Sequence, residues 1–217
     1  MSIRSAWIGE LLVIISLFCG IPRAVATDEF RLKLDVDDKI FKSKDSPFDL
    51  RPMLRTEQRF RQQGMVLLKV FAGLRSDVAS WLRLQAYYAH KDMFYADRKE
   101  IHLAVMDFVF HFKFGPVCVS DKNGNEWHSD GFYRYRNDLH LSISPGVTWL
   151  RLWLGDEIRV DSDQARLNMN DAKAGLDLRL GKTVIWSVYY DLESKHRSKP
   201  GWENTNVFQM MFILRLG

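Results

Sequence analysis

The chain has 217 residues, of which 47% are hydrophobic and 27% are charged, with a formal net charge of +4. This length is that of a single domain of ordinary size, and so mild a basic balance does not indicate a nucleic-acid partner. Seven Trp residues are many for one chain, and Trp and Tyr favour the boundary between lipid and water.

Residues 1–26 have the pattern of a secretory signal peptide. A positive charge precedes an apolar run at 11–18, which is far shorter than the roughly 20 residues of a membrane helix, and residues 24–26 are a small-residue cleavage site. Cys19 leaves a lipoprotein open, although the large side chain before it disfavours lipid attachment. The predicted mature domain is therefore 27–217. It retains only Cys118, so no intramolecular disulfide can form.

The first predicted strand covers residues 30–36, where apolar and charged side chains alternate. Such alternation is typical of a strand, because successive side chains point to opposite faces. Residues 42–54 contain two prolines and predict a long loop. The charged stretch 55–63 keeps the parity of the strand that follows it, so we expect it to extend that strand beyond the bilayer.

The rest of the chain alternates in the same way and ends on an apolar strand. Short connections are predicted at Ser76-Asp77, Gly115-Pro116, Pro145-Gly146 and Gly181-Lys182, and residues 121–131 predict a loop. The predicted strands after residue 64 are 65–75, 81–91, 102–114, 117–119, 132–144, 149–160, 172–180, 183–193 and 206–217.

This succession predicts an all-β fold, an up-and-down antiparallel transmembrane β-barrel of about ten strands, with eight or twelve as alternatives. Short and long connections alternate when the short strand 117–119 is included. An even count lets the first and last strands pair antiparallel and close the cylinder. No later stretch is long enough for a membrane helix, so a membrane location requires strands.

The second half of the chain carries a series of short motifs. Phe132-Tyr133-Arg134-Tyr135-Arg136-Asn137 leads into an alternating strand, and Gly155-Asp156-Glu157, Ala174-Gly175-Leu176, Tyr189-Tyr190-Asp191 and Trp202 follow before the last apolar strand. In this order they resemble a family of small bacterial outer-membrane β-barrel proteins known only as a domain of unknown function. The resemblance covers roughly residues 55–217. It implies a fold and a location, but no activity.

Alternation alone does not say which face points inward. A soluble periplasmic lipid-binding barrel would turn its apolar face inward. Bulky apolar faces on nearly every strand favour the outer membrane instead, as do the predicted girdle residues Trp81, Tyr133, Trp149 and Tyr190. The expected partners are outer-membrane lipids and lipopolysaccharide, and the barrel-assembly machinery during biogenesis; the oligomeric state is left open.

In this orientation the charged faces line the lumen, where charges must be paired or hydrogen-bonded. We interpret them as a polar plug in a barrel with a structural, envelope-associated role; a narrow anion-preferring channel is the alternative, because basic rings favour anions. The predicted lumen charge network consists of Arg83, Asp107, Lys113, Arg134, Arg136, Arg151, Glu157, Arg159, Asp177, Arg179, Asp191 and Arg215.

One set of residues suggests an enzyme. Asp138, His140 and Ser142 share a face of one strand, and an acid, a base and a nucleophile of this kind serve hydrolysis. Their Cα atoms are nearly 7 Å apart at this spacing, too far for a tight triad unless the side chains bend along the strand. An outer-membrane lipid or lipopolysaccharide hydrolase is thus an alternative, and a protein without catalysis is favoured.

The remaining motifs give weaker evidence of a function. Asp121, Asn123 and Asn125 begin like a calcium loop, but Glu126 replaces the required glycine. The six histidines show no ligand spacing, and no phosphate-binding loop is present, so we expect no metal and no cofactor. The arginines of 51–61 could contact lipopolysaccharide phosphates, or form a solvated outer rim.

Overall fold

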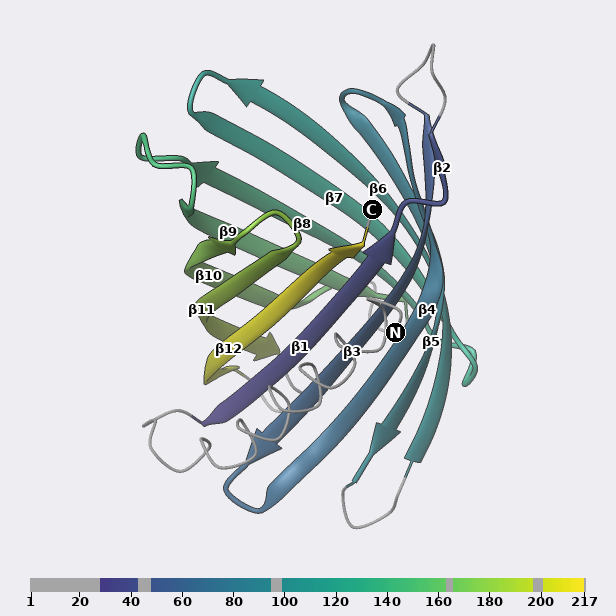
Figure 1. Cartoon of the computed structure of the whole chain (residues 1–217). Helices are drawn as coiled ribbons and strands as arrows, with labels where there is room; N and C mark the ends of the chain where they lie inside the picture. Colours follow the sequence, from purple (N-terminus) through teal and green to yellow (C-terminus); the bar gives the residue numbers. More distant parts are fainter. Residues whose placement is uncertain (1–27, 43–47, 95–98, 163–165, 197–200, 217) are drawn as a thin grey trace, which may run out of the picture.

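The computed structural model is a single sheet closed into a barrel (Figure 1). It describes residues 28–42, 48–94, 99–162, 166–196 and 201–216. The predicted signal peptide lies outside these residues. The strands are β1 Glu29–Asp38, β2 Phe41–Lys42, β3 Asp49–Arg61, β4 Gly64–Ala79, β5 Leu82–Met93, β6 Lys99–Phe114, β7 Val117–His128, β8 Tyr133–Ile143, β9 Leu150–Asp161, β10 Arg166–Leu180, β11 Val184–His196 and β12 Trp202–Leu216.

The prediction of an all-β, up-and-down barrel is confirmed, with eleven strands in the barrel and the short β2 added at one edge. Consecutive barrel strands pair antiparallel, as the connections predict. Within the described residues, no helix has the length and apolar character needed to cross a membrane.

The barrel closes through β1, and the expected antiparallel closure of an even-stranded barrel is wrong. β1 pairs antiparallel with β3 and parallel with β12, where Leu34 lies opposite Phe212. With an odd number of strands in up-and-down order, the first and last must run in the same direction. Figure 1 shows β1 and β12 side by side with their arrows pointing the same way.

The additional strand is β3, in the region expected to be a loop and a strand extension. A tight turn at residues 62–63 separates β3 from β4, and Gly64 has a φ of 108°, which favours glycine. The arginines of β3 were expected at an outer rim or at lipopolysaccharide phosphates, and this expectation is wrong for three of them. Arg51, Arg55 and Arg59 face the lumen and pair with carboxylates there, instead of forming an outer rim.

The other large correction is β7. The predicted short strand 117–119 continues to His128, and the stretch 121–131 expected to be a loop is mostly strand, paired with both β6 and β8.

A smaller correction concerns Ser76-Asp77, which lie within β4; the chain turns at residues 80–81. The turns at 115–116 and 181–182 are confirmed, and Pro145-Gly146 lies in the connection between β8 and β9.

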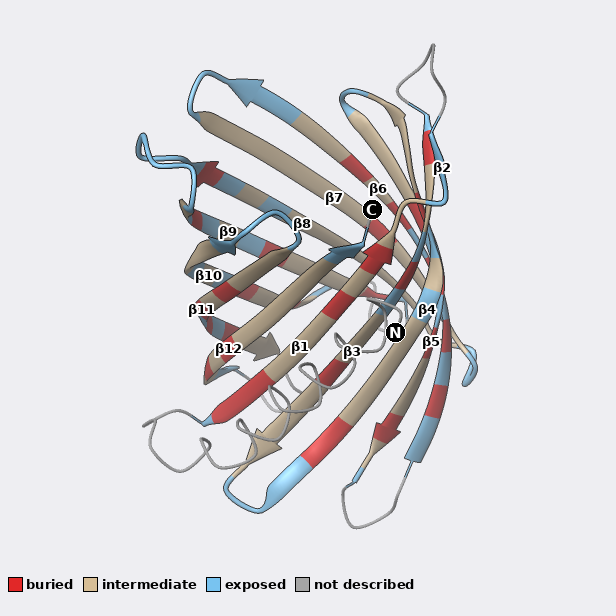
Figure 2. Cartoon of the chain, in the orientation of Figure 1, coloured by how far each residue is buried: buried red, intermediate tan, exposed pale blue. Residues whose placement is uncertain are grey.

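Along the strands, charged side chains mainly face the lumen and large apolar side chains mainly face outward. Arg31, Asp107 and Glu193 are at most 2% exposed, whereas outward-facing Leu154 is 59% exposed and Phe114 is 66% exposed. Figure 2 shows buried and exposed residues alternating along several strands. The barrel therefore has an ionic interior and an oily exterior, the reverse of a soluble barrel.

Candidate functional site

The lumen contains several ion-pair clusters, and the first surrounds Arg31 on β1. Arg31 donates hydrogen bonds to Glu29 (2.5 Å) and, across β12, to Glu193 on β11 (2.7 Å), and it lies 3.7 Å from Asp191. Gln209 on the intervening β12 donates to Asp191 at 2.6 Å. All five side chains are almost completely buried. Burial of so much charge is tolerable only because each charge has partners.

The second cluster lies across β5 to β8. Arg136 donates to Asp107 (3.0 and 3.2 Å) and to the Tyr87 hydroxyl (2.5 Å), which in turn donates to Asp107 (3.0 Å). The pair passes over Gly124 on β7, where a Cβ atom would lie 2.6 Å from both Arg136 Nε and Asp107 Oδ1. A side chain at this position would have to displace the Arg136 or Asp107 side chain, so glycine leaves room for the ion pair.

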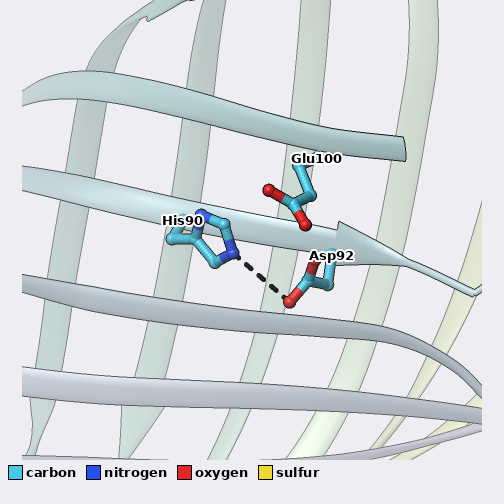
Figure 3. Close-up of side chains that lie close together, drawn as sticks. All are labelled: His90, Asp92 and Glu100. Carbon is cyan, nitrogen blue, oxygen red and sulfur yellow. Dashed lines mark hydrogen bonds and ion pairs between the residues drawn. The ribbon is translucent and has the colours of Figure 1, made fainter. Parts of the chain in front are cut away.

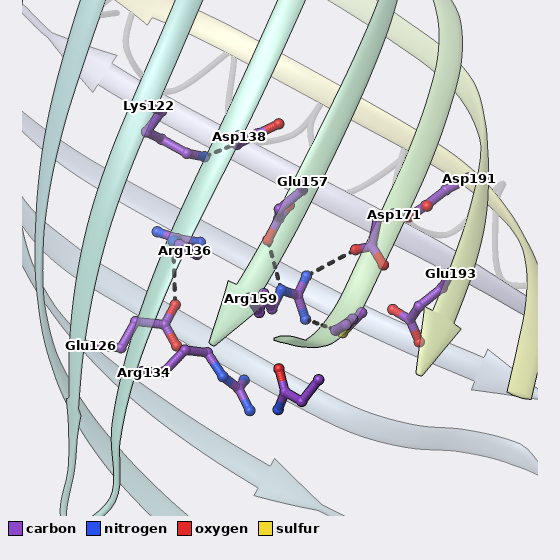
Figure 4. Close-up of polar contacts among 12 residues, drawn as sticks. Lys122, Glu126, Arg134, Arg136, Asp138, Glu157, Arg159, Asp171, Asp191 and Glu193 are labelled. Atoms are coloured by element: carbon purple, nitrogen blue, oxygen red, sulfur yellow. Dashed lines mark hydrogen bonds and ion pairs between the residues drawn. The ribbon is translucent and has the colours of Figure 1, made fainter. Parts of the chain in front are cut away.

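The third cluster joins β8, β9 and β10 (Figure 4). Arg159 donates to Glu157 (2.7 Å) and to Asp171 (3.1 Å), while Lys173 donates to Glu157 (2.5 Å) and to Asp138 (3.4 Å). Each buried carboxylate therefore has a cation beside it. Together the clusters line the middle of the lumen with paired charges.

A cavity of about 260 Å³ opens at the mouth where β3, β5, β9 and β11 end. It has six cationic side chains in its lining and no carboxylate. We call it the basic chamber. Its lining residues are Arg59, Leu67, Lys69, Lys91, Arg134, Arg159, Asn168, Met169, Lys195 and His196.

The cations of the basic chamber differ in how they are held. Arg134 donates twice to Asp161, at 2.5 and 2.9 Å, which fixes its guanidinium. Lys69 lies over the ring of Phe71 at 5.8 Å, and neither it nor Lys91 forms an ion pair with any residue that the structure describes. These two ammonium groups are therefore the cations best placed to take an external anion.

The opposite mouth is of mixed character. A cavity of about 360 Å³ there is lined by Trp149, Ile185, Arg151, Arg179 and Asp177, among others. Asp177 accepts a hydrogen bond from Trp153 Nε1 at 3.0 Å. The two cavities thus differ in charge: the basic chamber is lined by cations without a carboxylate, and the other cavity is lined by cations, a carboxylate and aromatic carbon.

The structure brings together most of the predicted lumen network. Arg83 pairs with Asp77 at 2.6 Å, and Asp107, Arg134, Arg136, Glu157, Arg159 and Asp191 belong to the ion pairs above. Arg151, Asp177 and Arg179 line the mixed mouth instead. Lys113 and Arg215 are exposed near the same end.

The predicted girdle residues lie on the outer wall at different heights. Trp81 stacks on Phe110, with ring centroids 6.2 Å apart, and Trp149 is exposed at the same end of the barrel. Tyr133 packs against Trp127 at the other end. Tyr190 lies near the middle of β11 rather than at its end, and its hydroxyl bonds to Asn206.

The predicted catalytic residues share one lumen-facing row of β8 but do not contact one another by hydrogen bonds. Asp138 pairs with Lys122 at 3.0 Å, and the ring of His140 lies 4.7 Å from that of Trp153. Ser142 Oγ donates to the backbone carbonyl of Cys118 at 3.5 Å. The three side chains therefore do not form a hydrogen-bonded triad.

A polar ladder interrupts the outer wall on β7 and β8, where the sequence suggested part of a calcium loop. Asn137 donates to Asp121 at 2.5 Å and Asn123 donates to Asp121 at 3.1 Å, while the Tyr135 and Tyr133 hydroxyls donate to Asn123 and Asn125. The ladder satisfies its own polar groups, which lowers the cost of placing them among apolar neighbours.

Sequence reasoning placed Lys69 and Lys91 on polar strand faces, but could not show that they meet Arg59, Arg134 and Lys195 at one mouth. Strand parity indicates only whether a side chain points into the lumen or away from it. The height of each residue depends on register across eleven strands, which the sequence does not state.

Fold and lumen together define this chain as a closed β-barrel with an ion-paired interior and an apolar exterior. The chain matches no protein-family model and shows no significant sequence match to a curated protein. The resemblance to a family of small outer-membrane barrels therefore stays a prediction.

Proposed function

We propose that this chain is a small outer-membrane β-barrel with a structural, envelope-associated role, whose lumen is closed by ion pairs. The observation that carries the proposal is the orientation of the two faces: charges are enclosed and large apolar side chains are exposed. Exposed apolar surface costs about 25 cal/mol per Å² in water, whereas lipid acyl chains remove that cost. The outer wall is thus suited to a bilayer.

The connections support an orientation within the membrane. Turns at residues 80–81, 115–116 and 181–183 share one end of the barrel with the end of β12. Short turns are typical of the periplasmic side of such barrels. The basic chamber would then open on the outer side, toward lipopolysaccharide, and insertion would depend on the barrel-assembly machinery.

Fractionation and electrical recording test the proposal. We expect the protein in the outer-membrane fraction, with gel mobility that changes on heating because a closed barrel resists unfolding at room temperature. In planar bilayers we expect no conductance at any voltage, because paired charges fill the lumen. Recovery in osmotic-shock fluid would instead indicate the soluble carrier, and steady anion current would indicate the channel.

The basic chamber favours a second candidate function, the capture of small anions at one mouth. Six cations line a cavity of about 260 Å³, and two of them, Lys69 and Lys91, have no ion-pair partner among the described residues, which suits a phosphate-sized group. A narrow anion-preferring channel would need the ion pairs below the chamber to separate. We therefore propose binding at the mouth rather than passage through the lumen.

Inorganic pyrophosphate is a suitable probe for the chamber. We expect it to raise the unfolding temperature of the detergent-solubilised barrel, and we expect the shift to disappear in Lys69→Gln/Lys91→Gln. Lys99→Gln is the matched control, because Lys99 lies outside the chamber beside Asp130. An equal shift in the wild type and the double variant would exclude the chamber.

The enzymatic alternative has weaker support. Ser142 donates to a backbone carbonyl and not to His140, so the nucleophile lacks its base in this arrangement. Unchanged lipid profiles when the wild type and Ser142→Ala are overexpressed would remove a lipid or lipopolysaccharide hydrolase.

A further inference from the structure

Four titratable side chains gather on the outer face of the β5–β6 hairpin. His90 lies directly opposite His102, and Asp92 directly opposite Glu100, in the register of the two strands. They point outward, since the alternate residues Ala89 and Lys91 line the lumen side. The pairing places two imidazoles and two carboxylates on adjacent rungs, although the partners on these rungs are twelve and eight residues apart in sequence.

The geometry of this cluster fits a metal ion. Ligand atoms of His90, Asp92 and Glu100 all lie within 4.8 Å of one another, and His90 Nε2 lies 3.3 Å from Asp92 Oδ2 (Figure 3). Ligands of a tetrahedral zinc ion are about 3.3 Å apart, given bond lengths of about 2.0–2.2 Å. Small side-chain rotations would therefore bring the three atoms around one ion.

The second nitrogen of His90 already has a partner. His90 Nδ1 lies 3.4 Å from His102 Nδ1, and the Tyr88 hydroxyl bonds to that same atom of His102. A metal-binding histidine usually has its other ring nitrogen hydrogen-bonded, which fixes its tautomer and ring orientation. His102 occupies this supporting position when its Nδ1 lone pair accepts from His90 Nδ1–H rather than from Tyr88, whose ring stacks on that of His102.

Electrostatics and location also favour a cation. Asp92 and Glu100 lie directly opposite each other on neighbouring strands, so each can contribute a carboxylate oxygen to the same cation. Along the outer face of β5 and β6, the outward apolar residues end at the Tyr88–Ala104 pair. The cluster occupies the next two pairs of outward residues. A divalent cation there would contact both carboxylates at the edge of the apolar band.

We propose that His90, Asp92 and Glu100 bind one divalent ion of the zinc class, with His102 and Tyr88 as positioning residues. The imidazole nitrogen decides the class, because calcium and magnesium prefer ligand sets made of oxygen alone. One neutral nitrogen and two carboxylates balance the charge of the ion. The site lies on the outer wall, separate from the basic chamber, and does not depend on anion binding.

Zinc titration of the full-length mature protein, purified without a histidine tag and treated with EDTA, tests the proposal. We expect one zinc ion per chain by competition with a chromophoric chelator. His90→Ala and Asp92→Asn should each weaken binding at least tenfold, and His102→Ala about tenfold, as for other supporting residues. Asp156→Asn, an outward carboxylate bonded to Asn170, is the matched control and should bind normally.

Two results would overturn the site: absence of saturable zinc binding, or equal binding by wild type, His90→Ala and Asp92→Asn. Heat-modifiable mobility checks that each variant is folded. X-ray absorption of the zinc-loaded wild type gives a second readout that needs no variant, and we expect one nitrogen and oxygen ligands around the ion. Displacement of zinc by an equal concentration of calcium would contradict the assigned metal class.

Discussion

Two walls of the lumen are filled by different means. On β3, β5 and β6 the inward side chains form an apolar cluster of Met53, Tyr87, Ala89, Ile101, Leu103 and Val105. On β1 and β9 to β11 they form ion pairs around Arg31 and Arg159. Tyr87 joins the two, because its ring lies edge-on to Phe71 at 5.7 Å while its hydroxyl donates to Asp107.

The two walls should respond differently to the loss of one side chain. Apolar packing is non-directional, so the loss of a methyl group costs transfer energy and leaves a cavity. An ion-pair cluster depends on being complete, because removal of one member leaves a buried charge without compensation. The comparison therefore predicts that single substitutions are more harmful in the charged wall than in the apolar wall.

The largest effect is expected for Arg31→Met. The substitution would leave Glu29, Glu193 and Asp191 buried without their shared cation, and breaking a buried pair costs about 3–5 kcal/mol. Urea unfolding of the barrel in lipid vesicles measures the loss. Arg61→Met is the matched control, since Arg61 is one-third exposed at the mouth. A loss no greater than that of Arg61→Met would contradict the comparison.

A smaller effect is expected for Leu103→Ala in the apolar wall. Truncation of a buried leucine to alanine typically costs about 2–5 kcal/mol, and this site should fall at the lower end because flexible Met93 packs against the cluster. The same unfolding measurement applies. Loss of a full 5 kcal/mol or so, above that of Arg31→Met, would reverse the ranking of the two walls.

The smallest effect is expected for Asp130→Asn, which removes an exposed pair with Lys99 at 3.3 Å. Such surface pairs contribute about 0–1 kcal/mol and weaken with salt. We expect an unfolding midpoint within error of the wild type at 0.5 M salt or so, where screening is nearly complete. A clear destabilisation at this salt concentration would mean that surface ion pairs contribute to the stability of this barrel. The stability losses measured for Arg31→Met and Leu103→Ala would then need correction for that contribution.

Much of the architecture was predictable because alternation has a local cause. Whether Arg136 or Leu141 points inward follows from parity along one strand. The strands that prediction missed, β3 and most of β7, carry polar side chains in the middle of their outward faces, at Thr56, Gln58, Asn123 and Asn125. At these positions both faces are polar, so the usual contrast between faces is weak.

The candidate sites were less predictable, because they depend on register between strands. Lys69 and Lys91 meet four other cations only when the pairing of the whole sheet is known. His90 and His102 are twelve positions apart, a spacing that suggests no ligand set until the hairpin aligns them. Gly124 likewise lies in the predicted loop 121–131, whereas in the barrel it leaves room for an ion pair.

The sequence by itself determined that the chain is built of strands with one oily and one charged face, because side-chain direction alternates with every residue. Only the tertiary structure decided that eleven strands close through a parallel pair, that cations gather at one mouth and that a histidine meets two carboxylates outside. The physical reason is that alternation is a property of one strand, whereas closure and height are properties of the whole hydrogen-bonded sheet.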